Sequence, residues 1–343
     1  MEEEDVRNRI WSSKTAAVGI IPFIRKRATC GFLSPGSTFA AWSWIAFGLT
    51  LFLILSMPVY SYAHGLAGKR FFPTTFTVDD PFISDEFSVL INRINQSGEE
   101  PDRLTQIDID YSKRILPNFG LEFHEAYLHL GSKGDGSANG WDNLGVGAKW
   151  QFLTNEEHEL ILSAGTDIDI GGTGSHRLSE SFSAITPAFF FGKGLGDLPE
   201  SVSFLRPFAV TGVVGPSFPT RSKNVTDAGI EYNPTTLNWG FTIQYSLMYL
   251  QSFVKDIGLG SPFNRMIIVT EFPMQTNLSR DNKGQTTGTV NPGIVWSGKF
   301  MELGIAAEIP INSASGKSVG VLGLIHLFID DLFPKSIGRP IFP

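Results

Sequence analysis

The feature that most constrains the fold of this chain is a strict alternation of apolar and non-apolar residues in several stretches. It is clearest between Asn143 and Phe152, where every second residue is apolar. Successive side chains of a β-strand point to opposite faces, so each such stretch predicts a strand with one apolar and one polar face. Strands of about ten residues with this pattern, repeated along a chain, are typical of transmembrane β-barrels. The pattern returns at Leu160–Ile170, Trp239–Tyr249 and Met301–Ile311.

The N-terminal region has the composition of a secretory leader. Basic residues at Arg25–Arg27 precede an apolar stretch from Ala40 to Val59, and Ser61-Tyr62-Ala63 places small residues where a signal peptidase cleaves. We therefore expect residues 1–63 to be a signal peptide cleaved near Ala63. The alternative is an uncleaved signal anchor, because about 20 apolar residues can span a bilayer. The long and initially acidic start of this region fits a translation start downstream of Met1.

Composition excludes several classes of protein. Charged residues make up 18% of the 343 residues and the mean hydropathy is +0.03, which is too polar for a bundle of membrane helices and too apolar for a disordered chain. Residues 1–63 hold six of the 27 Lys and Arg and four of the 34 Asp and Glu, so the remainder has a net charge of −9. That balance argues against nucleic-acid binding. The single cysteine, Cys30, lies in the leader, so we expect no disulfide and no thiolate metal site after cleavage.

Twelve strand candidates follow the leader, and an even number is what bacterial barrels have. We predict an all-β fold: a single antiparallel transmembrane β-barrel of about twelve strands (range 10–14) at residues 84–330. Residues 64–83 form a polar, Pro-containing lead-in in which apolar residues do not recur at a regular spacing. Residues 331–343 form a C-terminal tail. The strand candidates are Ser84–Asn92, Arg103–Arg114, Leu121–Leu130, Asn143–Leu153, Glu159–Ile170, Ser183–Lys193, Phe204–Val214, Leu237–Leu250, Arg265–Gln275, Thr286–Trp296, Phe300–Ile311 and Val319–Ile329.

Short and long connections alternate along the chain, as the two ends of such a barrel require. Pro117–Gly120 and Ser297–Lys299 predict tight turns, whereas Gly131–Gly140 and Pro216–Thr235 predict long polar loops. The alternation is imperfect, because Gln251–Asn264 is also long.

The alternation also predicts which residues line the lumen. A carboxylate in hydrocarbon would cost several kcal/mol, so the acidic faces of the strands should point inward and make the lumen acidic. Phe189–Phe191 places aromatic rings on both faces, so part of the lumen should be apolar and suit amphipathic or aromatic cargo. Three basic residues could pair with these carboxylates, or create an electric field across the lumen that selects solutes by charge. They are Lys149, Arg206 and Lys299. The predicted lumen-facing residues are Gln106, Asp108, Asp110, Lys149, Gln151, Asp167, Asp169, Gln244, Glu302 and Glu308.

Motifs that suggest chemistry lack the context they need. Gly316-Lys317-Ser318 resembles the end of a phosphate-binding loop, but the glycine required upstream is absent. His124 and His129 would face opposite sides of a strand, so they cannot share a metal ion. No serine lies in the G-x-S-x-G signature of an esterase. We therefore predict no enzymatic activity, no cofactor and no metal site.

Four segments resemble, as a set, the MetA-pathway phenol-degradation family of bacterial exported proteins. They are Asn143–Phe152, Asn155–Glu159, Gly192–Pro199 and Leu205–Ala209, and the similarity spans about residues 71–343. The resemblance implies an outer-membrane barrel involved in passage of aromatic or hydrophobic compounds, and brings no catalytic residues. The end of the chain departs from the usual pattern, since Phe342 is followed by Pro343, which cannot donate to a ladder. Either the tail folds back or the last strand pairs differently from the norm.

We therefore expect a passive channel or transporter for small, aromatic or hydrophobic molecules in a Gram-negative outer membrane. Its expected partners are outer-membrane lipid, the barrel-assembly machinery and a small-molecule solute, but no nucleic acid. An inserted loop could plug a barrel of this size. The alternatives are a structural or ligand-binding envelope barrel without transport, an esterase, and a soluble periplasmic lipocalin-like carrier, whose outward face should be polar.

Overall fold

The computed structural model describes residues 65–96, 102–131, 137–176, 178–226, 229–280 and 282–342. The predicted signal peptide, residues 1–63, lies outside the described residues. Within the ranges given above, no helix combines the length and the apolar character needed to cross a membrane.

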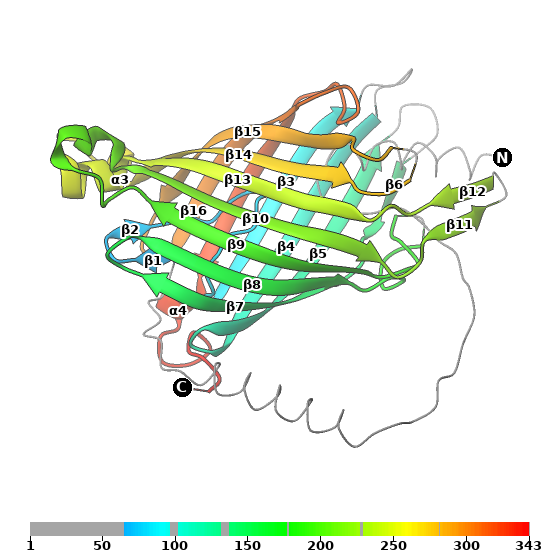
Figure 1. Cartoon of the computed structure of the whole chain (residues 1–343), viewed down its shortest axis with the longest axis horizontal. Helices are drawn as coiled ribbons and strands as arrows, with labels where there is room; N and C mark the ends of the chain where they lie inside the picture. Colours follow the sequence, from blue (N-terminus) through cyan, green and yellow to red (C-terminus); the bar gives the residue numbers. More distant parts are fainter. Residues whose placement is uncertain are drawn as a thin grey trace.

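A closed antiparallel barrel of twelve strands accounts for most of the described residues (Figure 1). Neighbouring strands pair in chain order, and the last strand pairs with the first of the barrel. Both β6 and β7 pair with β5, so together they fill one strand position. The predicted fold class is confirmed. The strands are β3 (Glu86–Gln96), β4 (Asp102–Leu116), β5 (Phe119–Gly131), β6 (Ser137–Trp141), β7 (Gly145–Asn155), β8 (Leu160–Asp169), β9 (Ala184–Gly194), β10 (Phe208–Pro219), β13 (Thr236–Ser246), β14 (Met266–Asn277), β15 (Thr286–Ser297), β16 (Met301–Pro310) and β17 (Gly320–Phe328).

The two ends of the barrel carry different connections. We call the end at which β3 starts and β17 finishes the turn end, and the opposite one the loop end. Figure 1 shows the short strands β1 (Leu66–Ala67) and β2 (Arg70–Phe71) at the turn end, together with α3 (Leu247–Tyr249) and α4 (Ile329–Leu332). The turn end also carries η1 (Glu200–Leu205), η2 (Leu250–Val254) and η3 (Phe263–Arg265), and the loop end carries the hairpin of β11 (Lys223–Thr226) and β12 (Gly229–Tyr232).

The structure corrects three details of the predicted strands. The predicted loop Gly131–Gly140 contains most of β6, and the predicted loop Pro216–Thr235 contains the β11–β12 hairpin. The predicted strand Leu237–Leu250 ends at Ser246, because the Ser246 hydroxyl accepts the Tyr249 N–H and caps a helical turn. Tyr249 is therefore buried at the turn end and does not face lipid.

The outward face of the barrel is apolar. Exposed side chains on it include Phe189 (40%), Ile243 (39%) and Val321 (52%). Aromatic pairs lie near both ends: Phe208 and Tyr245 at the turn end, Tyr127 and Trp141 at the loop end. Such rings favour the two membrane–water interfaces. This surface fits a lipid environment and does not fit the polar exterior expected of a soluble carrier. Other outward apolar side chains are Ile91, Phe123, Ile168, Ile185, Ile268, Leu303, Ile305 and Ile325.

The N-terminal segment, residues 65–85, starts at the turn end and enters the barrel, and we call it the plug. Its Phe76 N–H donates to Glu271 on β14, while its Asp79 carboxylate binds Lys149 on β7. In the ring of strands β7 and β14 are almost opposite, so a short segment can reach both only from within. Phe72 and Phe82 of the plug are also buried. The sequence predicted only a polar lead-in here.

The C-terminal tail folds back onto the barrel, which is the first of the two predicted alternatives. The N–H groups of Ile341 and Phe342 donate to the carbonyls of Arg114 (3.2 Å) and Ile115 (2.9 Å) near the turn end of β4. Phe328 ends the closing strand β17 and is buried. The tail therefore lies outside the strand that closes the barrel.

Candidate functional site in the barrel lumen

The plug enters and leaves the lumen at the turn end, where a buried ion pair holds its entry. The Arg70 guanidinium donates to the Glu159 carboxylate (3.0 Å) and to the Pro207 carbonyl (3.0 Å), and stacks 3.9 Å from the Tyr249 ring centroid. Burial lowers the pKa of Arg70, although the Glu159 carboxylate opposes that effect. Burial and the hydrogen bond to Glu159 raise the pKa of Tyr249 to about 12. Both groups lie outside the membrane-spanning strands.

A second set of ion pairs holds the point where the plug continues into β3. The fully buried Asp85 carboxylate accepts from the Arg114 guanidinium (2.7 Å) and from the Lys113 ammonium (2.5 Å). The Arg114 backbone N–H also donates to Asp85 (2.9 Å). Because Arg70 and Asp85 are both fixed at the turn end, the plug forms a loop that rises into the lumen and returns.

One buried carboxylate binds the tip of this loop through its backbone. Glu271 accepts the N–H groups of Phe76 (2.6 Å), Thr77 (2.8 Å) and Val78 (3.3 Å), and also the Thr77 hydroxyl (2.7 Å). Because three consecutive backbone N–H groups share this one buried acceptor, the contact orders the tip. Three further hydrogen bonds fasten the plug: Thr74 N–H to Glu302 (2.9 Å), Ile83 N–H to Gln151 (3.2 Å), and Ser163 hydroxyl to the Pro81 carbonyl.

On the opposite wall, Lys149 joins the plug to the barrel. Its ammonium lies 2.9 Å from both the Asp79 carboxylate and the Glu122 carboxylate, and 3.0 Å from the Asp80 carbonyl. It also lies 4.7 Å from the ring centroid of Phe190, which faces inward whereas Phe189 faces outward. The prediction of aromatic rings on both faces of this strand is therefore confirmed.

The lumen wall formed by β14 to β17 and β3 is apolar where the plug ring Phe76 packs. Gly304 faces this ring, and a Cβ at Gly304 would lie 2.8 Å from it, so only a residue without a side chain leaves the ring room. A partly apolar lumen was expected from Phe189–Phe191, and this wall, formed by other strands, is a further apolar part. The residues that form one buried apolar cluster with Phe76 are Leu90, Ile267, Val269, Val295, Ala306, Leu322 and Leu324.

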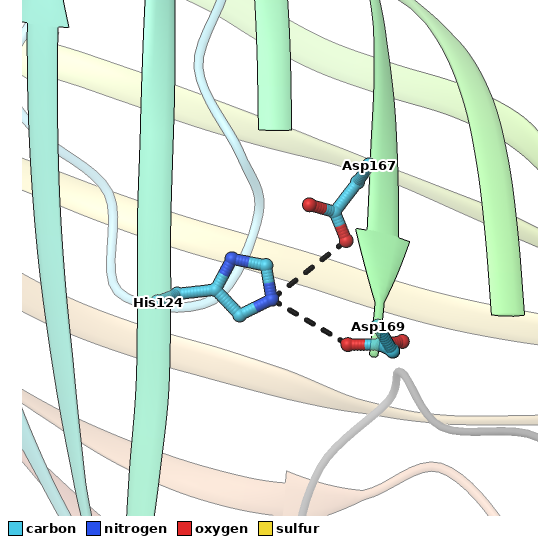
Figure 2. A group of neighbouring side chains, drawn as sticks. All are labelled: His124, Asp167 and Asp169. Atoms are coloured by element: carbon cyan, nitrogen blue, oxygen red, sulfur yellow. Dashed lines mark ion pairs between the residues drawn. The ribbon is translucent and has the colours of Figure 1, made fainter. Parts of the chain in front are cut away.

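On the loop-end side of the plug the lumen is acidic. Figure 2 shows the Asp167 and Asp169 side chains of β8 directed toward the imidazole of His124 on β5. Its Nε2 atom lies 3.7 Å from Asp167 Oδ2 and 3.6 Å from Asp169 Oδ1. All three side chains are partly exposed. We call this region the acidic vestibule; its residues are Asp108, Asp110, His124, Asp167 and Asp169.

The ten predicted lumen residues fall into three groups. Contacts with the plug occupy Lys149, Gln151 and Glu302. Three buried side chains are hydrogen-bonded to other residues of the wall: Gln106 to Asp108, Gln244 to Thr211, and Glu308 to Asn92. The remaining four, Asp108, Asp110, Asp167 and Asp169, lie in the acidic vestibule. Of the three predicted basic groups, Arg206 pairs with Glu200 and Lys299 contacts Phe300, both in turn-end connections and away from the lumen.

Sequence reasoning missed several residues of this site. Glu271 lies in a strand where Ile267 and Val269 share its inward face, so alternation of polarity did not mark it. Arg70 lies in the lead-in, where apolar and polar residues do not alternate, so no pattern in the sequence indicated its direction. His124 was treated as an ordinary strand residue because it was compared only with His129, and its true neighbours come from another strand.

No family model matches this chain, and no curated protein matches it. Several solved structures are similar in shape. The KdgM porin is 14% identical, with a TM-score of 0.40, covering 70% of this chain and 98% of the porin. The COG4313 outer membrane channel from Pseudomonas putida F1 is 13% identical, with a TM-score of 0.47 and coverages of 75% and 99%. The NanC porin is 6% identical, with a TM-score of 0.44 and coverages of 70% and 98%. The resemblance to the phenol-degradation family stays a prediction.

Proposed function

We propose that this protein is an outer-membrane channel or transporter for small molecules whose lumen is closed at rest by its own N-terminal segment. The observation that carries the proposal is the plug, which lies across the lumen between β7 and β14. Hydrogen bonds, ion pairs and packing hold it, so it can leave without breaking a covalent bond. Outer-membrane lipid and the barrel-assembly machinery are the partners that such a protein requires.

The polar wall that faces the plug supports a plug that moves. Among the residues that the structure describes, Thr242 Oγ1, Gln244 Oε1 and Asn291 Oδ1 are buried without a hydrogen-bond partner. An unsatisfied buried polar group costs about 1–3 kcal/mol. Water would satisfy these atoms if the plug withdrew, which offsets part of the free energy needed to break the hydrogen bonds between plug and wall. The wall is better suited to a hydrated lumen than to a permanently packed one.

The two kinds of lumen wall indicate the chemistry of the cargo. The apolar wall around Phe76 lies within the same lumen as the acidic vestibule. A solute that contacts both needs an apolar part and a neutral or cationic polar part, because an anion would be repelled by Asp167 and Asp169. We therefore propose small amphipathic or aromatic molecules as the cargo class.

Replacing residues 72–83 with a short Gly/Ser linker tests the proposal. Arg70 and Asp85 both stay at the turn end, so the linker can span the mouth of the barrel there without rising into the lumen. Purified variant and wild type would be compared in liposomes for solute flux and single-channel current. We expect much larger conductance from the variant, and folding of both would be checked by heat-modifiable gel mobility. Equal conductance of two folded barrels would contradict the proposal.

The dense packing of the plug favours a second candidate, a barrel that binds a ligand or stabilises the cell envelope and transports nothing. Phe72 and Phe82 are almost completely buried, as they would be in a permanent core. Under this alternative the linker variant conducts, but the wild type never opens, with or without amphipathic solutes. Cell fractionation that recovered the protein with the soluble periplasm would contradict both candidates.

A further inference from the structure

Three side chains of the acidic vestibule converge from two strands onto one point. His124 lies on β5 and pairs in register with Gly145 on β7, and Gly145 pairs in register with Asp169 on β8. Asp167 lies two residues before Asp169 and therefore on the same face of β8. Figure 2 shows both carboxylates directed at Nε2 of the imidazole. The donor atoms all lie within 4.8 Å of one another, and hydrogen-bonded strands fix their positions.

The separations between these atoms are informative. A charge-assisted hydrogen bond from an imidazolium to a carboxylate would be about 2.7–2.9 Å long. His124 Nε2 is instead 3.6 Å from Asp169 and 3.7 Å from Asp167, longer than such a bond although within ion-pair distance. Ligands bound tetrahedrally at about 2.0–2.2 Å from a zinc ion are separated by roughly 3.4 Å. The two measured separations are close to that value, and the two carboxylate donors lie within 4.8 Å of each other, so one ion can reach all three donors.

A glycine on the intervening strand makes room for this arrangement. A Cβ at Gly145 would lie 1.7 Å from His124 Nε2. Any side chain at position 145 would therefore occupy the place of the imidazole nitrogen. The donor set is an imidazole with two carboxylates, which differs from a group of acidic residues alone. Its partial exposure leaves further positions for water or a solute.

We propose that His124, Asp167 and Asp169 form a binding site for one divalent transition-metal ion, with Zn²⁺ as the probe that tests it. Imidazole suits zinc and its neighbours, whereas calcium and magnesium prefer sites made only of oxygen atoms. Three protein ligands with a remaining open position are the arrangement of zinc sites that bind an additional molecule. The site lies in the lumen, so it would place a bound cation beside any solute passing through the loop end.

Zinc binding to the full-length folded barrel in detergent tests this site. Titration calorimetry should give one Zn²⁺ per chain, and H124Q and D169N should each weaken binding roughly tenfold or more. The variant G145A is the sharpest test, because it keeps all three donors and only displaces the imidazole; it should weaken binding to a similar extent. The matched controls are H129Q, on the same strand but the opposite face, and G323A, where a Cβ meets nothing within 4 Å.

The two controls should bind zinc as the wild type does. Absence of stoichiometric binding by the wild type would overturn the proposal and leave an ion pair of His124 with the two aspartates. Equal loss in H129Q and H124Q would show adventitious binding and overturn it as well. The linker variant lacking residues 72–83 retains the three ligands, so its zinc binding separates failure of this site from failure of the plug.

Discussion

At the scale of single residues, buried charges in the lumen and at the turn end determine where the plug lies. Arg70 and Glu159 are 1% and 4% exposed as side chains, and each has the other as its counter-ion. Glu271 is fully buried and binds backbone N–H groups. Burial of such groups is costly unless every polar atom is satisfied, so removal of one partner has large effects.

Removing the Arg70 charge should destabilise the barrel more than removing the whole ion pair. R70M leaves the Glu159 carboxylate buried without its counter-ion, and loss of one partner of such a pair costs about 3–5 kcal/mol. The double variant R70M/E159Q removes the isolated charge, so its free energy of unfolding should lie closer to that of the wild type. Denaturant titration in detergent measures both. A double variant less stable than R70M would contradict this view of the pair.

Removing the Glu271 carboxylate should loosen the tip of the plug without unfolding the barrel. E271A deprives the N–H groups of Phe76, Thr77 and Val78 of their acceptor, at about 1–3 kcal/mol for each group that stays buried and unsatisfied. Hydrogen exchange at these amides should become faster, while strand amides keep their protection. The control E200A changes an exposed carboxylate and should leave exchange unchanged. Unchanged exchange in E271A would show that the tip is held by other contacts.

At the scale of elements, the alternation of side chains predicts the strands because each has one face toward lipid. All the predicted strands are present, whereas β6 and the β11–β12 hairpin were missed. Ser137, Asn139 and Gly140 make β6 look like a loop, and each strand of the β11–β12 hairpin has only four residues. The plug could not be predicted from periodicity. It is held by its own backbone N–H groups and by side chains distant in sequence, and neither leaves a repeating pattern.

The C-terminal tail should stabilise the turn end without being needed for barrel closure. Lys113 donates to the carbonyls of Ile337 (2.8 Å) and Arg339 (2.6 Å), and Arg114 donates to Gly338 (3.2 Å). Truncation after Phe333 removes these acceptors and should lower the thermal midpoint while the heat-modifiable band remains. Shortening the β11–β12 hairpin at the loop end is the control and should not change the midpoint. Loss of the folded band on truncation would contradict this assignment.

At the scale of the whole molecule, the lumen has a packed part at the plug and a more open acidic part toward the loop end. The sequence predicts that carboxylates face inward because hydrocarbon excludes them. It does not predict which carboxylates bind the plug and which face solvent, because that depends on a segment that precedes the barrel. Glu302 and Asp167 were therefore predicted alike, although the first binds Thr74 and the second lies beside His124.

A reversible cross-link between plug and wall tests most directly whether plug movement opens the lumen. A Cβ at Gly240 would lie 3.0 Å from Val78 Cγ2, which places a V78C/G240C pair near the Cβ separation of about 3.5–4.5 Å that a disulfide needs. The single variants V78C and G240C are the controls, and the linker variant is the open reference.

Single-channel current of the V78C/G240C barrel would be recorded after oxidation and again after addition of a reductant. With the plug tethered the barrel should remain closed, and reduction should restore the opening events of the single variants. Equal current from the oxidised and reduced forms would contradict gating by the plug.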